Sequence, residues 1–331
     1  MITDSDLSRL SAGGPLRFAI TGGGNGAAID RRVELAQELG FDGLWMGNGG
    51  GGPDIFMLLT RVITMSDTLH VGTSVFLLPL RDPTLVAQQV ATLDEMSKGR
   101  FLFGVGVGGD RPRDFSIYGL DPKERGARMD ESLDLMRALW LGEEVHHHGK
   151  FFNVDGKLSV QAFTRPVPPM LIGQRGGPSV LQQRAYDRVI RVGQGWLPYS
   201  TAPELYARGL QSIAERGGKD LVLGVVEWTN IGEGDGQDAI EYSVVRKAAD
   251  YSRAGAAPDA AVERMRRLVN AGNADAVVAR LQKYVDLGVT EFIFNWASEP
   301  GTEEQQMRRA AELVIPRVRE YAAARAATVR A

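Results

Sequence analysis

The chain of 331 residues contains no cysteine. This absence excludes disulfide bonds, thiolate nucleophiles, Fe–S clusters and cysteine-ligated zinc. An excess of one charge is also missing, since 38 lysine and arginine residues accompany 41 aspartate and glutamate residues, a formal net charge of −3. No apolar run approaches the roughly 18 residues that a membrane-spanning helix needs. We therefore expect a cytoplasmic protein whose partners are neither nucleic acid nor membrane.

Glycine, by contrast, is abundant. It accounts for 40 of the 331 residues, well above the ~7% of an average protein. Many of these glycines cluster in four segments, at 22–26, 47–52, 104–109 and 173–177. Glycine permits positive φ and lets a ligand approach the backbone closely, so these segments are candidate ligand-binding loops.

Short apolar segments alternate with amphipathic helical patterns along the whole chain. Alternation of this kind indicates βαβ units and a parallel sheet covered on both faces, which is the α/β class. Eight strands are predicted, at 16–20, 43–46, 70–76, 100–105, 169–172, 195–197, 221–229 and 291–295. Eight such units favour one (β/α)8 TIM barrel domain over residues 1–331. A doubly wound open sheet is disfavoured because no unit carries the ribose-binding acid of a dinucleotide domain.

Two segments depart from the simple repeat. Residues 145–160 are rich in aromatic, β-branched and glycine residues, which predicts a β-hairpin inserted after the fourth helix, residues 125–141. The C-terminal part predicts extra helices between 236 and 287 and a long last helix over 303–324. The glycine segments all follow strands, so they should lie at the carboxyl ends of the strands, where barrel enzymes have their active sites.

Several segments then carry a more specific pattern. They read ELGFDGLW, GTSV, LDEMSKGR, FLFGVGVG, ERGARMDE, MRALW and PPMLIG, at residues 38–45, 72–75, 93–100, 101–108, 124–131, 136–140 and 168–173. In this order they resemble the bacterial luciferase-like family of flavin-dependent oxidoreductases. The resemblance covers about residues 16–200, and it is weak as a guide to the substrate.

This resemblance implies a barrel that binds reduced FMN or the deazaflavin coenzyme F420 at its rim, as a homodimer. It also implies a non-proline cis peptide at the end of the third strand, Ser74–Val75, against which the isoalloxazine ring packs. The glycine-rich end of the fourth strand, with Gly106 and Gly108, would leave room for that ring. Its G-x-G-x-G spacing is not a dinucleotide-binding fingerprint.

The stretch IGQRGGPSV, residues 172–180, follows the fifth strand and opens a helix. Free backbone N–H groups at a helix start, with the Ser179 hydroxyl and the Arg175 charge, form an anion site. The turn is similar to the Gly-Pro phosphate turn of deazaflavin-dependent members. The resemblance therefore assigns the cofactor phosphate to Arg175, Gly176, Gly177, Pro178 and Ser179, and favours F420 over FMN.

The catalytic positions of the family are less well matched. Members commonly carry an acid and one or two histidines after the second strand, where this chain has Asn48 and Gly49. Deazaflavin-dependent sugar-phosphate dehydrogenases place a glutamate after the fourth strand, where this chain has Gly109 followed by Asp110. General acid–base catalysis needs a titratable group, so Asn48 and Asp110 are the remaining catalytic candidates. The pair Asp110-Arg111 is equally compatible with a solvated ion pair.

The histidines do not predict a metal site. His146, His147 and His148 are consecutive, and consecutive side chains of a strand point to opposite faces, so they cannot converge on one ion. His70 begins the third strand, at the end away from the rim, and is expected to be structural. Trp45 and Trp196 lie on or next to strands near the rim, where they would either wall a substrate pocket or belong to the core.

Three functions remain open. The first is an F420-dependent oxidoreductase that transfers a hydride between C5 of the deazaflavin and a small organic substrate. The second is an FMN-dependent monooxygenase that uses reduced FMN and O₂. The third is a flavin-binding protein without catalysis, which the missing histidine and glutamate suggest.

Overall fold

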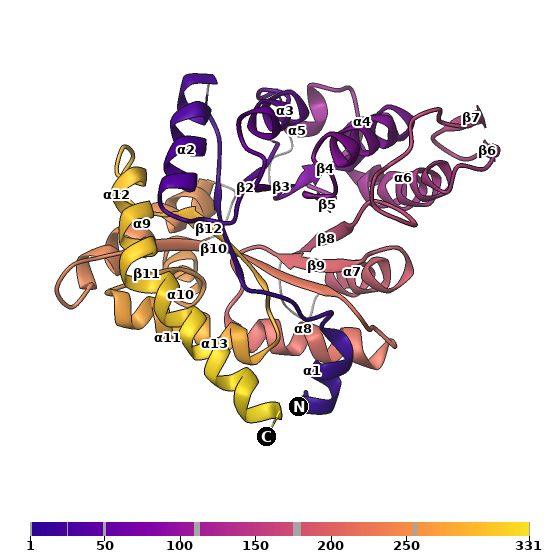
Figure 1. Cartoon of the computed structure of the whole chain (residues 1–331). Coiled ribbons are helices and arrows are strands. Elements are labelled where there is room, and N and C mark those ends of the chain that lie inside the picture. The colour runs from indigo at the N-terminus through magenta and orange to yellow at the C-terminus, as the bar shows by residue number, and fades with distance from the viewer. Residues whose placement is uncertain are drawn as a thin grey trace.

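The centre of the molecule is a closed barrel of eight parallel strands (Figure 1). The computed structural model describes residues 2–24, 26–48, 51–108, 113–174, 180–253 and 257–330. The barrel strands in spatial order are β1 (Arg17–Thr21), β2 (Gly43–Met46), β3 (His70–Thr73), β5 (Phe101–Gly106), β8 (Met170–Gln174), β9 (Gly195–Pro198), β10 (Val222–Ile231) and β12 (Glu291–Trp296). The ring closes because β12 pairs with β1 and β9 pairs with β10. The predicted barrel and its eight strands are confirmed.

Helices surround the barrel and follow its strands. They are α2 (Gly26–Glu38), α3 (Ile55–Met65), α4 (Pro83–Met96), α6 (Arg125–Trp140), α7 (Val180–Arg191), α8 (Pro203–Glu215), α11 (Ala274–Asp286), α12 (Glu303–Arg309) and α13 (Ile315–Arg330), with a π-helical turn at Ala310–Val314. Local sequence explains where they begin. Asp82 caps α4 by accepting a hydrogen bond from the Thr84 N–H at 2.9 Å, and Pro83 occupies the first turn, where no N–H is needed.

The inserted hairpin is also confirmed. Strand β6 (Val145–His148) pairs antiparallel with β7 (Asn153–Gly156) directly after α6, the fourth helix of the barrel. A short helix α5 (Arg113–Ser116) follows β5, and a two-residue strand β4 (Phe76–Leu77) continues the path of β3 and pairs with β5.

The C-terminal part contains one strand that the sequence pattern does not reveal. Helices α9 (Gln237–Arg253) and α10 (Pro258–Leu268) are followed by a short strand, β11 (Asn270–Gly272), which precedes α11. This strand pairs parallel with the end of β10. The helices predicted between 236 and 287 are present as α9, α10 and α11, but the sequence pattern misses β11, because three residues are too few to show a strand period. Helix α1 (Asp4–Leu10), near the N-terminus, also lies outside the predicted elements.

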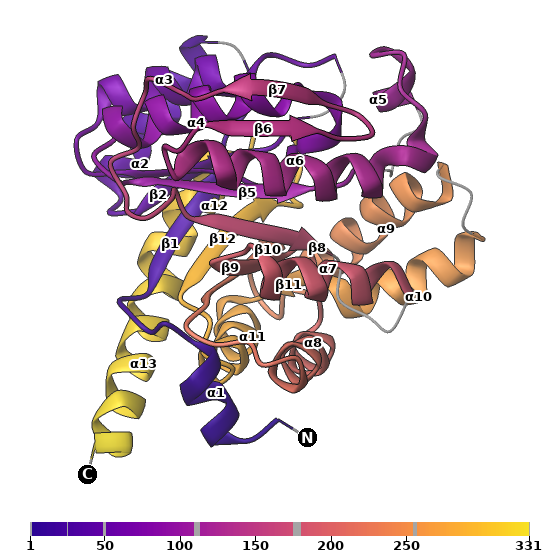
Figure 2. The ribbon, with the colours of Figure 1, turned by 90° about the vertical axis from the view of Figure 1, so that its right-hand side faces the viewer.

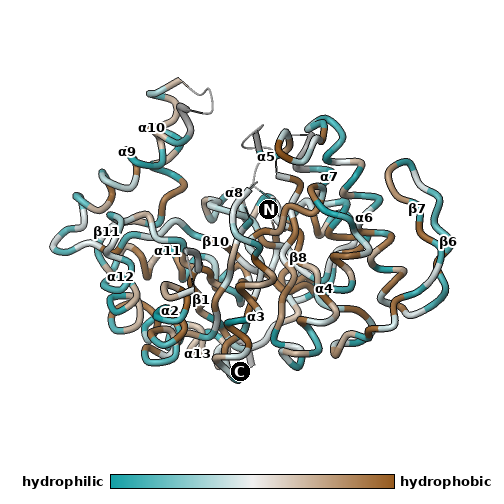
Figure 3. Tube along the Cα trace, turned by 90° about the horizontal axis from the view of Figure 1, so that it is seen from above, coloured by the Kyte–Doolittle hydropathy of each residue, from teal (hydrophilic) through white to brown (hydrophobic). Residues whose placement is uncertain are grey.

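The carboxyl ends of the strands define one face of the molecule. Figure 2 shows β5 and β8 ending on the side where α5, α9 and α10 lie. In Figure 3, which views the molecule from above, α9 and α10 stand out from the rest of the chain. We call the open end of the barrel on this side the mouth.

Candidate active site

Below the mouth, a layer of apolar side chains fills the barrel and forms the floor of the candidate site. Successive side chains of a strand alternate between the inside and the outside of the barrel. Seven inward-facing, almost fully buried residues contact one another there: Ala19, Trp45, Leu102, Leu171, Leu197, Val226 and Ile293. Because this layer occupies the interior, a ligand of the barrel has to lie above it, at the carboxyl ends of the strands.

On one side of the mouth, the segment between β3 and β4 places Val75 over the floor. The peptide bond Ser74–Val75 is cis, as the family resemblance implies. Two glycines leave space for the Val75 side chain. A Cβ on Gly106 would lie 2.7 Å from Val75 Cγ2, and a Cβ on Gly173 would collide with Val75 Cγ1. The space that Gly106 leaves is therefore taken by Val75, so any effect of Gly106 on a ligand acts through Val75.

Asn48 holds this segment in place. Its Oδ1 accepts a hydrogen bond from the Leu77 N–H at 2.6 Å, and its own N–H donates to the Val75 carbonyl at 3.4 Å. These contacts give the predicted catalytic residue Asn48 a positioning role beside Val75. Gly108, two residues beyond β5, adopts a φ of 66°, which favours glycine, and packs against Leu77.

Ser74 offers an unused polar group beside Val75. The residue is 9% exposed, and its Oγ has no hydrogen-bond partner among the described residues. A buried hydroxyl without a partner costs free energy, which a polar atom of a bound ligand would recover. The combination of an apolar Val75 surface and the Ser74 hydroxyl fits the edge of a flavin or deazaflavin ring, which carries both apolar and hydrogen-bonding atoms.

Large side chains occupy the opposite side of the mouth. Each of three residues follows an inward-facing floor residue by two positions and therefore points into the barrel: Tyr199 directly after β9, Trp228 on β10 and Asn295 on β12. The Tyr199 hydroxyl accepts hydrogen bonds from Trp228 Nε1 at 2.9 Å and from Asn295 Nδ2 at 2.5 Å. The Tyr199 and Trp228 rings also meet edge to face, with centroids 5.4 Å apart. Three neighbouring strands thus combine into one polar and aromatic wall.

A lysine side chain lies over this wall. Lys247 of α9 places its Nζ 4.6 Å from the centroid of the Trp228 ring, a cation–π contact. Burial lowers the pKa of Lys247 to about 8, and the nearby Arg246 acts in the same direction. The ammonium group therefore carries a positive charge near the mouth at neutral pH.

Outside the barrel wall, a buried ion pair fixes the loop that follows β9. Glu227 faces away from the barrel interior and is 1% exposed, and Arg280 Nε donates to its Oε2 at 2.7 Å. Arg280 also donates to the carbonyl of Thr201 at 3.4 Å. Burial raises the pKa of Glu227, although Arg280 and Tyr284 lower it. Because Thr201 lies two residues after Tyr199, this pair restrains the loop that carries the aromatic wall.

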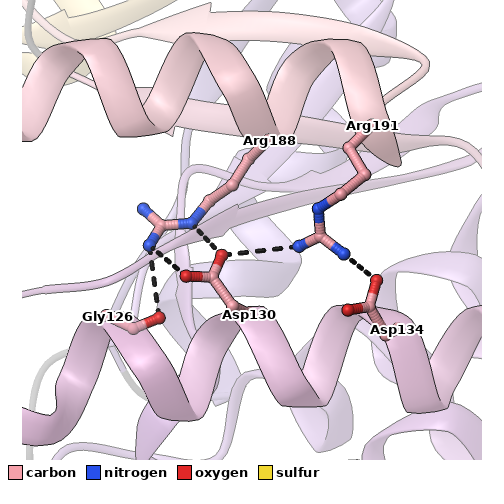
Figure 4. Close-up of polar contacts among 5 residues, drawn as sticks. All are labelled: Gly126, Asp130, Asp134, Arg188 and Arg191. Atoms are coloured by element: carbon pink, nitrogen blue, oxygen red, sulfur yellow. Dashed lines mark hydrogen bonds and ion pairs between the residues drawn. The ribbon is translucent and has the colours of Figure 1, made fainter.

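Helix α7 begins directly after residues 175–179 and is fastened to α6 by ion pairs (Figure 4). Arg188, 6% exposed, donates through Nε to Asp130 Oδ1 at 2.7 Å and through Nη2 to Asp130 Oδ2 at 3.0 Å. The same Nη2 donates to the Gly126 carbonyl at 3.2 Å. Arg191, more exposed, pairs with Asp130 and Asp134. These contacts fix the helix to which the predicted phosphate turn is attached.

Several predicted site residues lie outside the part of the chain that the structure describes. They are Asp110 with its neighbours Gly109 and Arg111, Gly49, and the turn residues Arg175, Gly176, Gly177, Pro178 and Ser179. Their assignments remain predictions. The polar wall was missed at the sequence level, although the two-residue alternation from Leu197 to Tyr199 would have placed the phenol inside the barrel. Lys247 had no comparable signal.

The histidines of the hairpin divide between two faces, as strand alternation requires. His146 and His148 lie near Asp155, at 3.0 and 3.6 Å, whereas His147 lies 3.2 Å from Glu131. Among the described residues, no group of three or more histidine, aspartate or glutamate side chains could hold a metal ion. His70 lies at the amino end of β3, and burial lowers its pKa to about 4. This position confirms that it lies away from the mouth.

The two tryptophans near the rim belong to the core. Trp45 is fully buried in the floor, where its indole lies against Gly72. Trp196 is fully buried on the outer side of the barrel wall, with its ring centroid 4.6 Å from that of Tyr206. Neither one therefore walls a pocket at the mouth. In the described ranges, no helix is both long and apolar enough to cross a membrane.

Fold and site together define an α/β-barrel protein with a candidate ligand site at the carboxyl ends of its strands. Residues 15–225 match the family described as luciferase-like monooxygenase, and the chain belongs to this family. Over 86% of its length the chain is 26% identical to an F420-dependent glucose-6-phosphate dehydrogenase of Amycolatopsis mediterranei (strain U-32), of which it covers 92%.

Solved structures share the fold at lower identity. Monooxygenase RslO1 from Streptomyces bottropensis superposes with a TM-score of 0.74 at 22% identity, over 91% of this chain and 99% of that one. The coenzyme F420-dependent tetrahydromethanopterin reductase from Methanopyrus kandleri superposes with a TM-score of 0.73 at 18% identity, over 92% and 99%. At this identity the likeness concerns the fold alone.

Proposed function

We propose that this protein is an oxidoreductase that uses the deazaflavin coenzyme F420 to transfer a hydride to or from a small organic substrate at the barrel mouth. The observation that carries the proposal is the relationship to F420-dependent glucose-6-phosphate dehydrogenases, which runs along most of both chains. It is supported by a mouth in which Val75 and the unpartnered Ser74 hydroxyl suit the ring of such a cofactor.

In this proposal, Ser74, Val75 and Gly108 hold the ring, and residues 175–179 hold the phosphate. Gly106 contributes by leaving space for the Val75 side chain. When bound, the deazaflavin supplies or accepts the hydride, which no side chain can do. The protein contributes orientation and a dry surface. Val75 presents an apolar face, Asn48 keeps the segment around Val75 in position, and the filled floor excludes water from below.

The principal alternative is an FMN-dependent monooxygenase. It is favoured by the description of the family and by the shared fold with a monooxygenase, whereas the sequence relatives cited above favour the deazaflavin. Both cofactors carry a phosphate and a flat tricyclic ring, so the described residues of the mouth accept either one.

Binding titrations of the purified protein with oxidised F420 and with FMN distinguish these proposals. We expect micromolar binding of F420 and at least about 10-fold weaker binding of FMN, a difference of ~1.4 kcal/mol. Binding of FMN alone would refute the deazaflavin proposal. Binding of either cofactor without turnover on a broad panel of alcohols, carbonyl compounds and sugar phosphates would favour a non-catalytic flavin-binding protein.

The phosphate assignment has its own test. Arg175→Ala and Ser179→Ala should each weaken binding of the preferred cofactor by about 10-fold, because each loses a hydrogen bond to a charged phosphate, worth ~1.5–3 kcal/mol. Arg31→Ala is the matched control, since Arg31 of α2 is about half exposed and pairs with Glu304 of α12, away from α7. Unchanged affinity in both turn variants would contradict the assignment.

A homodimer is also proposed, on the family resemblance. Exposed large apolar side chains on α3 and α4, Met57 at 74% and Leu85 at 50% exposure, would suit a subunit contact. Light scattering coupled to size-exclusion chromatography should give twice the 36.0 kDa chain mass. A monomer across the micromolar range would refute it.

A further inference from the structure

Helices α9 and α10, which we call the arm, lie between β10 and α11 in the chain and on the side of the mouth in space (Figure 2). Their apolar side chains pack on one another and on Trp228. The buried residues of the arm in this cluster are Val244, Ala248, Ala261, Met265 and Leu268. Trp228 also lies under Lys247 of the arm and donates to Tyr199. One side chain therefore joins the arm to the aromatic wall.

Behind the wall, Arg280 of α11 joins the arm to the loop that follows β9. Its Nη1 and Nη2 donate, each at 3.1 Å, to the last two carbonyls of α10, those of Arg267 and Leu268. The same Nη2 donates to the Thr201 carbonyl at 3.4 Å, and Nε donates to Glu227 Oε2 at 2.7 Å. One guanidinium thus binds three segments: the end of α10, the loop after β9, and β10.

These bonds are buried and specific to arginine. The Arg280 side chain is 16% exposed and that of Glu227 is 1% exposed, so breaking the pair would leave a buried charge without its partner. The Tyr284 hydroxyl lies within hydrogen-bond distance of both the Thr201 carbonyl and Glu227 Oε1, and so supports the same loop. A guanidinium has five N–H groups in fixed directions, whereas an ammonium is one point charge. Arg280→Lys would therefore keep a charge beside Glu227 without binding all three segments.

Each of these three segments contains or contacts Trp228. Glu227 precedes it on β10, with the two side chains on opposite faces of the strand. The loop held at Thr201 follows Tyr199, whose ring meets the Trp228 ring edge to face with centroids 5.4 Å apart. The end of α10 belongs to the arm, which packs on Trp228. Loss of the bonds made by Arg280 should therefore displace Trp228, whichever segment moves.

We propose that Arg280 is the positioning residue for the substrate side of the mouth. It keeps the arm, with Lys247, and the loop after β9, with Tyr199, in one fixed arrangement, so that a substrate meets both at a set separation. The inference rests on the proposed function, in which the cofactor ring lies on the opposite side, at the Ser74–Val75 segment. Arg280 lies behind the barrel wall, so it acts on the substrate only through the side chains that it positions.

Fluorine NMR of protein labelled with fluorotryptophan follows the wall directly. The chain has five tryptophans, and Trp228→Phe identifies the resonance of Trp228. Arg280→Met and Arg280→Lys should each shift this resonance by more than its linewidth. Arg17→Met is the matched control, because Arg17 also pairs with a buried carboxylate, that of Glu291 at 2.6 Å, but at the amino ends of the strands. It should leave the Trp228 resonance in place.

The titration of Lys247 gives a second readout, which a general loss of stability would not move. Burial and Arg246 lower the pKa of Lys247 to about 8, and Asp250 acts in the opposite direction. In the wild type the Trp228 resonance should therefore shift with a midpoint near pH 8, and Lys247→Met should abolish this step. In Arg280→Lys the midpoint should rise towards the ordinary value of 10.5, because water reaches an ammonium that the arm no longer holds in place.

Ligand measurements separate the two sides of the mouth. The F420 affinity of Arg280→Lys should stay within about threefold of the wild type, because the cofactor side keeps its contacts. For any substrate accepted from the panel of alcohols, carbonyl compounds and sugar phosphates, Arg280→Lys should raise KM by roughly 10-fold or more. Arg17→Met should change neither value.

A Trp228 resonance at its wild-type position and midpoint in Arg280→Lys would overturn the inference, whether or not Arg280→Met folds. An unchanged KM for an accepted substrate, or an equal Trp228 shift in Arg17→Met, would overturn it as well. If the wild type fails to bind F420, only the proposed function is refuted, and the Trp228 resonance still decides the role of Arg280.

Discussion

Replacing Gly106 by alanine tests the packing that shapes the mouth. The new Cβ would lie 2.7 Å from Val75 Cγ2 and 3.6 Å from Val75 Cβ. Among the described residues, apart from the two chain neighbours of Gly106, no other atom lies within 4 Å of it. The first distance is too short for two carbon atoms, whereas the second is ordinary contact. Alanine at position 106 should therefore push the Val75 side chain, and little else.

The expected magnitude follows from these contacts. Overpacking a core by a methyl group costs ~1–3 kcal/mol. Gly106 does not have a positive φ, so alanine also gains about 0.4–1 kcal/mol from the less flexible unfolded chain. We expect Gly106→Ala to lower the free energy of unfolding by about 0.5–2 kcal/mol. A displaced Val75 should also weaken cofactor binding by at least about 10-fold, or ~1.4 kcal/mol.

A double-mutant cycle with Val75→Ala isolates the contact. Val75→Ala alone should cost ~1–2 kcal/mol of stability through lost burial. In the double variant only the 3.6 Å contact remains, so the penalty of Gly106→Ala should disappear, a coupling of about 1–2 kcal/mol. Urea denaturation and F420 titration measure the two effects, with Gly126→Ala as the control, since its Cβ would meet its nearest neighbour at 3.5 Å. Additive losses in the cycle would refute this account of Gly106.

Two further predictions concern the support of the site and the other end of the barrel. Arg188→Met should lower the free energy of unfolding in urea by about 1–3 kcal/mol, because it removes buried charge-assisted hydrogen bonds between α7 and α6. Arg191→Met, at a side chain that is 41% exposed, should cost less than ~1 kcal/mol, and equal losses would contradict the role of Arg188. Burial raises the pKa of Glu291 from 4.5 to about 7, although the Arg17 guanidinium 2.6 Å away lowers it. The folded protein thus holds a proton that the unfolded chain releases, so the free energy of unfolding should fall by on the order of 1–3 kcal/mol as pH rises from about 4.5 to 7. Glu291→Gln should lack this slope, and parallel pH curves for the two proteins would exclude Glu291 as its origin.

Most of the fold could be predicted because its signals are local. Buried parallel strands are continuous apolar runs, and each helix carries its own apolar face and its own cap, such as Asp82 before α4. The prediction failed at β11, where three residues form a strand only because the long β10 extends past β12 and offers them an edge. The hairpin after α6 could be predicted from the sequence because residues 145–160 are rich in aromatic, β-branched and glycine residues.

The site could be predicted in part. The cis bond at Ser74–Val75 came from the family resemblance and is present. The role of Gly106 was not visible, because the atom that fills its space belongs to Val75, 31 residues earlier in the chain. The histidine run could be set aside from the sequence, since alternation along a single strand is a local property.

By itself, the sequence determined the βα repeat, the closed barrel and the rim at which its glycine-rich loops gather, because each follows from short-range patterns and a rule of barrel architecture. Only the tertiary structure decided which side chains meet at that rim. Tyr199 contacts Trp228 across 29 positions of sequence and Asn295 across 96. These pairs form because barrel closure sets the ends of β9, β10 and β12 side by side, and no local pattern encodes which strands become neighbours.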